Sequence, residues 1–443
     1  MRQYFFGLLT ILIASTLLSC GVSYQLKRSA TQTLLQKPVL KNAHVGVSIY
    51  DPAAKKFWYN HQGDKYFVPA SNTKIPTCYA AMKFLGDSIL SAYVLDSADI
   101  LYVRPVGDPS FLLPEFAAQP LLNRIKASGK EVMLDISTNH RFSAFGSGWS
   151  WDDFQEAYLA ERSALPIYGN VVTFTSRNNS LTALPSMVLR SPFMNESMIQ
   201  LVGKGGKFQV VRQQDQNIFS LANSSRTFSK AVIPFKTLQG TTSFTFLKDT
   251  LSRLGINSML RLVADAPSGQ PIYSIATDSL LRPLMHRSDN FFAEQSLLMV
   301  SQRLLGKMDD DAVIDTLLKT VLADLPQRPR WADGSGLSRY NLFTPQDFVR
   351  ILEKMKDEFG MNRVKSIFPT GGEGTIANYY TKDSGYIYAK TGTLSGVVSL
   401  SGFLYTRKGK LLLFSTLVNN HQASSTEIRR LVEEFLQGVR EKY

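Results

Sequence analysis

Three short motifs follow one another along the chain, and together they carry the side chains of a serine acyl-transfer reaction. Ser71 is followed by Lys74, and then come Ser288-Asp289-Asn290 and Lys390-Thr391-Gly392. The first motif offers a nucleophile with a base one helical turn away, the second a polar relay, and the third a cation that can hold a carboxylate. At ordinary residue usage, all three in this order occur by chance in roughly one of several hundred chains. The order therefore predicts a serine enzyme that works without histidine.

Each motif residue has an expected role in that chemistry. A serine hydroxyl attacks well only when a base removes its proton, and Lys74 is the base nearest to Ser71. Burial and the charge of Lys390 can lower the pKa of Lys74 enough for it to act. We expect Ser288 to pass a proton to the leaving amine and Asn290 to bind the amide of the substrate.

Histidine and metal chemistry are not expected. The histidines lie in no nucleophile elbow or triad-like motif, and His286 is interpreted as a surface residue that flanks a helix. No H-E-x-x-H motif or paired-cysteine pattern occurs, so neither a metal nor a cofactor is predicted. Cys78 lies on an apolar helical stripe and is predicted to be a core residue rather than a nucleophile.

Local patterns place the first motif after a hairpin and on a helix. Val45–Tyr50 and Phe57–Asn60 alternate around a turn and predict a β-hairpin. Apolar residues at spacings of three and four after Ser71 predict a helix that ends at Gly86. Pro76, which lacks an N–H, predicts a distorted first turn in that helix.

The second and third motifs lie in the last third of the chain. Phe291–Leu305 predicts an amphipathic helix directly after the second motif. Three strands of an antiparallel sheet are predicted at Ile387–Lys390, Val397–Tyr405 and Leu411–Val418. The first of these strands can present the N–H of Thr393 opposite that of Ser71, and we expect these two groups to form an oxyanion hole. Ser424 and Glu427 form a capping box that begins a closing helix.

The middle of the chain has a different texture. Short β-type runs alternate there with clusters of Gly, Asn, Ser and Pro. The runs are Ile100–Val103, Val171–Thr175, Phe208–Arg212 and Ser243–Phe246. Phe246–Leu254 predicts a helix, and Gly203–Lys207 is interpreted as a hairpin turn rather than a phosphate loop. The predicted fold is one α+β unit, residues 21–95 and 273–443, split by a mostly β insertion at residues 96–272.

The N-terminal segment predicts export. Arg2 precedes the apolar stretch Phe5–Leu18, which is too short to span a bilayer, so residues 1–20 are predicted to be a secretion signal. The ending Leu17-Leu18-Ser19-Cys20 resembles the lipobox of bacterial lipoproteins. It predicts lipidation of Cys20 and a membrane-anchored protein that faces the periplasm. Acylation of Cys20 would leave Cys78 alone, so no internal disulfide is expected.

The composition is that of a globular protein with a basic surface. The chain has 443 residues, of which 44% are hydrophobic and 19% charged, and its net charge is +13. The basic residues are scattered, with no basic run that interleaves with aromatic residues, so nucleic acid is not an expected partner. An anionic membrane face or an acidic polymer such as peptidoglycan fits the charge.

Taken with their flanking residues, the motifs resemble the class C low-molecular-mass penicillin-binding proteins, the D-alanyl-D-alanine carboxypeptidase/endopeptidase family, over nearly all of the mature length. The similar stretches outside the motifs are Val68-Pro-Ala-Ser71, Gly107-Asp-Pro109, Gly148-Trp-Ser-Trp-Asp-Asp153, Asp333-Gly-Ser-Gly-Leu-Ser-Arg339-Tyr-Asn341 and Gly371-Gly-Glu-Gly-Thr375. The long interval between Ser71 and Ser288 is also typical of the inserted domains of this family.

The resemblance implies a β-lactamase/transpeptidase-like domain, an inserted accessory region and a serine DD-peptidase activity. The implied substrates are peptidoglycan stem peptides, cut as a D-Ala-D-Ala carboxypeptidase, a DD-endopeptidase or both, and β-lactams are the implied inhibitors. Ser71 would attack the D-Ala-D-Ala bond and form an acyl-enzyme that water then resolves.

The resemblance also implies residues that bind substrate. Lys390 and Thr391, with Gly392 and Thr393 beside them, would hold the terminal carboxylate of the stem peptide. Asp153 matches an acidic position near the peptide, where it either pairs with a free amine or serves as a surface or capping residue. Arg339 is a similar candidate.

Two other functions share parts of this pattern. A serine β-lactamase carries the same three motifs, but class A members need a glutamate in an E-x-x-L-N loop, and no such motif lies between Ser71 and Ser288. A non-catalytic lipoprotein that binds the cell wall would keep the fold without the activity. The intact motifs favour an enzyme over that scaffold.

Overall fold

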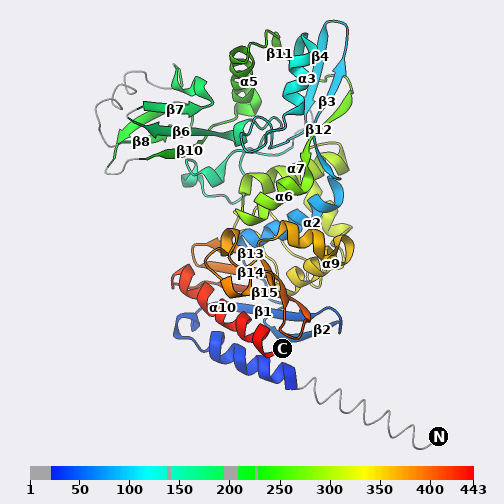
Figure 1. Cartoon of the computed structure of the whole chain (residues 1–443), viewed down its shortest axis with the longest axis vertical. Coiled ribbons are helices and arrows are strands. Elements are labelled where there is room, and N and C mark those ends of the chain that lie inside the picture. The colour runs from blue at the N-terminus through cyan, green and yellow to red at the C-terminus, as the bar shows by residue number, and fades with distance from the viewer. Residues whose placement is uncertain (1–20, 137–140, 179, 191, 194–207, 225–227) are drawn as a thin grey trace, which may run out of the picture.

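The computed structural model describes residues 21–443 except 137–140, 179, 191, 194–207 and 225–227. The expected signal at residues 1–20, its Cys20, and the hairpin turn expected at Gly203–Lys207 lie outside the described residues. In Figure 1 the sheet and both terminal helices occupy one end of an elongated molecule, and the insertion occupies the other. Within the described ranges, every helix is too short or too polar to cross a bilayer.

The central sheet is built from both ends of the chain. Its order is β13-β14-β15-β1-β2, and each neighbouring pair is antiparallel. The strands are β1 (His44–Asp51), β2 (Lys56–His61), β13 (Ile387–Leu394), β14 (Val397–Tyr405) and β15 (Leu411–Asn419). The predicted hairpin and the three predicted C-terminal strands are therefore confirmed. Because β1 pairs with β15, the N-terminal hairpin extends the C-terminal sheet.

Two layers of helices cover the sheet. One face carries the helix at residues 21–30 and α10 (Ser425–Lys442). Ser424 caps α10 by accepting the N–H of Glu427, at the start predicted for this helix. The other face carries a helical cluster (Figure 1). Its helices are α2 (Lys74–Phe84), α6 (Thr277–His286), α7 (Asn290–Leu305), α8 (Asp310–Lys319) and α9 (Pro345–Ile367). Cys78 on α2 is buried in this cluster as a free thiol, which confirms its prediction as a core residue.

The insertion contains two groups of strands around a separate core. A five-stranded sheet has the order β11-β5-β4-β3-β12, and a three-stranded sheet has the order β10-β6-β7 beside the β8-β9 pair. The five-stranded sheet contains β3 (Ser88–Asp96), β4 (Ile100–Pro105), β5 (Glu131–Leu134), β11 (Leu260–Leu262) and β12 (Gln270–Ala276). The other strands are β6 (Val171–Arg177), β7 (Ser180–Leu184), β8 (Phe208–Arg212), β9 (Phe219–Asn223) and β10 (Lys230–Pro234), and the helices are α3 (Pro120–Ser128) and α5 (Thr241–Arg253).

Two sequence expectations about the insertion need adjustment. The strand predicted at Ser243–Phe246 is wrong, because those residues belong to α5. Ser243, Phe246, Leu247 and Leu251 are buried at helical spacing, and that period prevails over local β propensity. The expected segment limits at 95 and 273 fall inside β3 and β12, which pair with each other. We propose junctions near residues 87 and 277, since these keep the five-stranded sheet whole.

Candidate active site

Ser71 lies on a tight turn that precedes a helix rather than within the helix itself. The segment Ala70–Thr73 is a 3₁₀ turn, and α2 begins at Lys74. Pro76 is therefore the third residue of α2, where no N–H has an intrahelical acceptor. The distorted turn that Pro76 predicts is this 3₁₀ turn, and it leaves α2 intact.

The amine of Lys74 lies against the nucleophile and is completely buried. Its Nζ is 3.0 Å from Ser71 Oγ, 2.6 Å from Asn290 Oδ1 and 2.6 Å from the carbonyl oxygen of Ser335. Burial lowers the pKa of Lys74 to about 8, against opposing effects of nearby carboxylates. A base near this pKa is partly neutral at neutral pH, as proton abstraction from Ser71 requires.

Two of those carboxylates, Asp333 and Glu294, belong to residues to which sequence reasoning gave no role in the site. Asp333, Glu294 and Asp289 each raise the pKa of Lys74. Burial, together with Asp333, raises the pKa of Glu294 to about 7. Glu294 Oε1 accepts the N–H of Ser335 at 2.7 Å, so this side chain also positions the carbonyl that binds Lys74. A sequence signal existed, because Glu294 stands four residues after Asn290 on the same face of α7.

Asp333 shapes the loop that carries Ser335. Its carboxylate accepts hydrogen bonds from the N–H groups of Gly336 and Ser338 and from the side chains of Asn341 and Trp149. The carboxylate is buried, and four donors around one buried group hold the loop in a single shape. The stretch 333–341 therefore positions Lys74 rather than contacting the nucleophile itself.

The second motif fills the junction between α6 and α7. Ser288 has a φ of +59°, a left-handed conformation that turns the chain between the two helices. Asp289 caps α7 by accepting the N–H of Phe292. Asn290 accepts from Lys74 through Oδ1 and donates through Nδ2 to the carbonyl of Tyr158, which belongs to the insertion.

The third motif brings a second buried amine to the site. Lys390 Nζ lies 2.8 Å from Ser288 Oγ and 2.6 Å from the carbonyl of Thr391. Burial, then the positive charges of Lys74 and Arg429, hold the pKa of Lys390 well below its usual range. The Thr391 hydroxyl hydrogen bonds with that of Thr375 at 2.7 Å. The three motifs thus form one connected group, as predicted.

Gly392 lets the strand reach the nucleophile. A Cβ at this position would lie 2.2 Å from Ser399 Oγ, 2.7 Å from the carbonyl of Pro69 and 2.9 Å from the backbone nitrogen of Ser71. Only glycine permits this approach. β13 is an edge strand beside Ser71, a geometry that suits the oxyanion hole expected from the N–H groups of Ser71 and Thr393. The exposed Thr393 hydroxyl accepts from Arg429.

The two weaker candidates lie farther from Ser71. Asp153 ends the 3₁₀ turn Trp151–Asp153 and hydrogen bonds with the Tyr158 hydroxyl. Because the carbonyl of Tyr158 binds Asn290, this carboxylate is two contacts from the second motif. Arg339 is exposed and donates to the carbonyl of Ser395 at 2.8 Å, beside the turn after β13.

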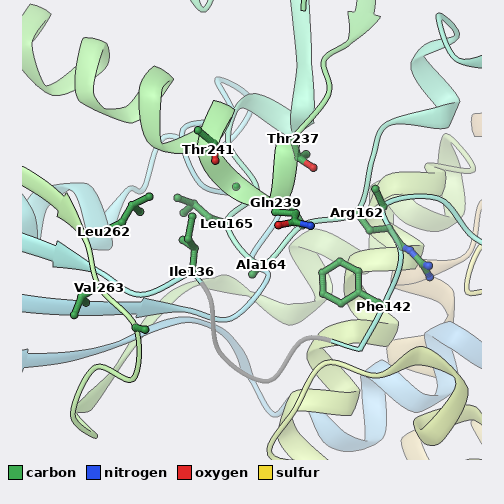
Figure 2. Close-up of a pocket in the computed structure, with 14 residues that line it drawn as sticks. Ile136, Phe142, Arg162, Ala164, Leu165, Thr237, Gln239, Thr241, Leu262 and Val263 are labelled. Carbon is green, nitrogen blue, oxygen red and sulfur yellow. The ribbon is translucent and has the colours of Figure 1, made fainter. Parts of the chain in front are cut away.

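Other features lie outside the catalytic group. His286 ends α6 with its side chain only 12% exposed, so it flanks a helix as expected but is not the surface residue predicted. Arg162, which contacts Glu294 and Asp310, borders a cavity of about 660 Å³ in the insertion (Figure 2). None of the predicted site residues lines that cavity.

The serine, the buried lysine beside it and the two later motifs have the arrangement of a serine acyl-transfer enzyme in which lysine stands where other enzymes have histidine. Comparisons with known proteins agree. Residues 27–439 match the D-Ala-D-Ala carboxypeptidase 3 (S13) family. A D-alanyl-D-alanine carboxypeptidase of Actinomadura sp. is 25% identical over 439 residues, which cover 89% of this chain and 81% of the relative. D-alanyl-D-alanine carboxypeptidase DacB of Haemophilus influenzae is 24% identical over 471 residues, 97% of each chain.

A crystal structure shows a similar fold at low sequence identity. Penicillin binding protein 4 of Haemophilus influenzae aligns with a TM-score of 0.69 and 21% identity, covering 94% of this chain and 98% of that one. The chain belongs to the D-Ala-D-Ala carboxypeptidase 3 (S13) family, a family of serine hydrolases. Its α+β fold, predicted from the sequence, is thereby confirmed.

Proposed function

We propose that the protein hydrolyses the D-Ala-D-Ala bond of peptidoglycan stem peptides through an acyl-enzyme on Ser71. The observation that carries this proposal is the buried Nζ of Lys74, 3.0 Å from Ser71 Oγ and in contact with the second motif. The relatives named as D-alanyl-D-alanine carboxypeptidases support the same substrate. The site is equally suited to carboxypeptidase and endopeptidase cleavage, since both reactions break the bond after a D-Ala carbonyl.

The contacts suggest a sequence of proton transfers. Neutral Lys74 takes the proton of Ser71 as Oγ bonds to the carbonyl carbon, and the charge on the oxygen is held by backbone N–H groups. The C–N bond then breaks, and a proton passes through Ser288 to the leaving amine. Water adds to the ester, the bond to Oγ breaks, and Ser71 regains its proton. A β-lactam follows the first half of this path and stays attached.

The third motif, together with Asp153 and Arg339, would orient the peptide. Lys390 and Thr391 would hold the terminal carboxylate, close to Ser288 and Thr375. Asp153 would pair with a free amine of the stem peptide, and Arg339 would contact the peptide beyond the turn after β13. For location we propose export, lipidation of Cys20 and a periplasmic position on a membrane.

Mass spectrometry with benzylpenicillin tests the catalytic proposal. The wild-type protein is expected to gain one penicilloyl group, and Ser71→Ala is expected to gain none. Ser279→Ala, an exposed serine on α6, is the matched control and should be acylated normally. An unmodified wild-type protein would favour a non-catalytic scaffold, and rapid turnover of penicillin would favour a β-lactamase. Product analysis with defined muropeptides would then separate carboxypeptidase from endopeptidase action.

The lipid anchor needs its own test. Cys20→Ala is expected to release the protein from membranes of the producing cells when they are washed with about 1 M salt, which screens surface charge within about 3 Å, because the change removes the only acylation site proposed. Unchanged association with the salt-washed membrane fraction would refute lipidation at this residue.

A further inference from the structure

The net charge of +13 is not explained by the catalytic site, and part of it gathers at one end of the molecule. We call this end the basal face. It consists of exposed basic residues from four separate segments that meet where the described chain begins. They are Lys27, Arg28, Lys55, Lys56, Arg407, Lys408, Lys410 and Lys442.

Contacts around the C-terminal residue hold these segments together. The Tyr443 hydroxyl donates to Gln25 on the first helix at 3.0 Å, and its ring lies 5.4 Å from that of Trp58 on β2. The N–H of Lys408, in the turn between β14 and β15, donates to the carbonyl of Tyr443 at 3.1 Å. Lys410 Nζ lies 5.6 Å from the ring centroid of Trp58. The basal face is therefore part of the folded structure rather than a set of unrelated side chains.

The first helix separates a buried face from a basic one. Leu26, Ala30 and Leu34 are buried against the core that contains α10. Lys27 and Arg28 are exposed on the opposite side, with Tyr24, whose exposure of 70% is high for an aromatic residue. Basic residues beside an exposed tyrosine are typical of helices that lie in a membrane interface.

Acidic groups do not neutralise this face. Glu441 pairs with Arg407 at 2.6 Å, and the buried carboxylate of Asp51 pairs with Lys410 at 3.3 Å. Five of the eight basic residues form no ion pair with any residue in the described ranges. They are Lys27, Arg28, Lys55, Lys408 and Lys442. A surface with this excess of positive charge attracts a negatively charged membrane surface.

We propose that the basal face docks on an anionic phospholipid bilayer. The proposal rests on the lipid anchor proposed above, because the helix that carries Tyr24, Lys27 and Arg28 lies within a few residues of Cys20 in the sequence. An acyl chain at Cys20 would bring this helix to the headgroups, and the basic residues would then hold the molecule in one orientation. In Figure 1 the first described helix lies beside the C-terminus, at the end opposite the insertion, so docking would direct the insertion away from the membrane.

Vesicle binding of the protein without its acyl chain tests the docking separately from the anchor and from catalysis. Residues 21–443 lack the proposed signal and the proposed acylation site and contain every described helix and strand, so they are the form to use. This form is expected to sediment with vesicles of mixed phosphatidylglycerol and phosphatidylcholine, but not with pure phosphatidylcholine. Binding should be lost when salt is raised from about 0.1 M to about 1 M, where screening acts within about 3 Å.

Charge reversal identifies the face. Each basic residue near an anionic membrane contributes roughly a fivefold factor to partitioning, so Lys27→Glu, Arg28→Glu and Lys408→Glu together should weaken binding at least about 100-fold. The matched control reverses three exposed lysines of the insertion, Lys126, Lys230 and Lys248.

Several outcomes would overturn the proposal. An equal loss of binding in the control would show that net charge alone matters, and absence of wild-type binding to anionic vesicles would show that the face has another partner. Acylation of every variant by benzylpenicillin verifies its fold. A failure of docking with normal acylation therefore leaves the proposed catalytic function standing.

Discussion

Removing the charge of Glu294 should make Lys74 a better base at neutral pH. Glu294 Oε1 accepts the N–H of Ser335, whose carbonyl accepts Lys74 Nζ, and the carboxylate raises the pKa of that amine. Glu294→Gln keeps an oxygen acceptor for Ser335 and removes the negative charge. Arg162 keeps its ion pair with Asp310 at 2.6 Å. The pKa of Lys74 is therefore expected to fall below about 8.

The size of the effect follows from the fraction of neutral amine. With a pKa of about 8, roughly one Lys74 in eleven is neutral at pH 7, whereas a fall of one unit would make about half of them neutral. Acylation at pH 7 should then be up to about fivefold faster, while the rate on the high-pH plateau should fall modestly, because a base of lower pKa is intrinsically weaker. Because the pKa of Glu294 is about 7, its carboxylate is mostly charged near pH 8, where Lys74 titrates. Removing that charge therefore shifts the titration of Lys74.

Acylation rates with benzylpenicillin, measured across pH, give the pH at which the rate is half of its plateau value. This pH midpoint reports the pKa of Lys74. The wild-type rate should rise about tenfold per pH unit below 8 and then level off. Glu358→Gln is a matched control, because that glutamate binds Tyr79 and Lys83 on another side of the helical cluster. A midpoint for Glu294→Gln that stays in place or moves upward would refute the reasoning. A similar shift in Glu358→Gln would show a general effect of charge.

Four further results are expected. Gly392→Ala should slow acylation at least tenfold, because the new Cβ would lie 2.2 Å from Ser399 Oγ and 2.9 Å from the backbone nitrogen of Ser71. Acylation at the wild-type rate would contradict the close approach of β13 to Ser71. Asp333→Ala should lower the free energy of unfolding in urea by about 3 kcal/mol or more, since four donors lose a buried acceptor, and a loss below about 1 kcal/mol would argue against that network. Cys78 should resist iodoacetamide until the protein is unfolded, because burial raises the pKa of its thiol, and rapid alkylation of the native protein would contradict its burial. A stem peptide that ends in a carboxamide should acylate with a higher pH midpoint than the free acid, and identical midpoints would exclude a role for the terminal charge.

Residue patterns predicted those elements in which the spacing of apolar residues within one short segment already indicates a strand or a helix. β1, β2, β14, β15 and α7 were found within one residue of their expected bounds, whereas β13 runs four residues past its expected end at Lys390. Cys78 lies in the core as its stripe predicts. The strand at Ser243–Phe246 failed because Thr and Phe have β propensity, whereas burial of Leu247 and Leu251 selects a helix. The expected limits at 95 and 273 cut through β3 and β12, because the pairing of these two strands across the insertion cannot be read from local sequence.

The motif residues of the site were predicted, but their electrostatic surroundings were not. Spacing brings Ser71 and Lys74 together within one turn, and nothing in it indicates that Glu294 and Asp333 act on the same amine. Arg162 contacts Glu294 across 132 residues of sequence, a pairing that only the packing of the insertion on α7 creates. Local sequence therefore identifies the reacting groups, and tertiary contacts set their pKa values.

The two buried lysines are not equivalent, and this difference gives the site a means of responding to substrate. Three carboxylates raise the pKa of Lys74, whereas the charges that act on Lys390 are the positive ones of Lys74 and Arg429. Burial and these positive charges therefore hold the pKa of Lys390 well below its usual range, which favours its neutral amine. A substrate carboxylate beside Lys390 would favour its charged form. If the ammonium of Lys390 lies nearer to Lys74 than that carboxylate does, the new positive charge prevails and lowers the pKa of Lys74. Binding of the correct peptide would thus free the base at the moment when Ser71 has a carbonyl to attack, which is why the carboxamide peptide is expected to need a higher pH.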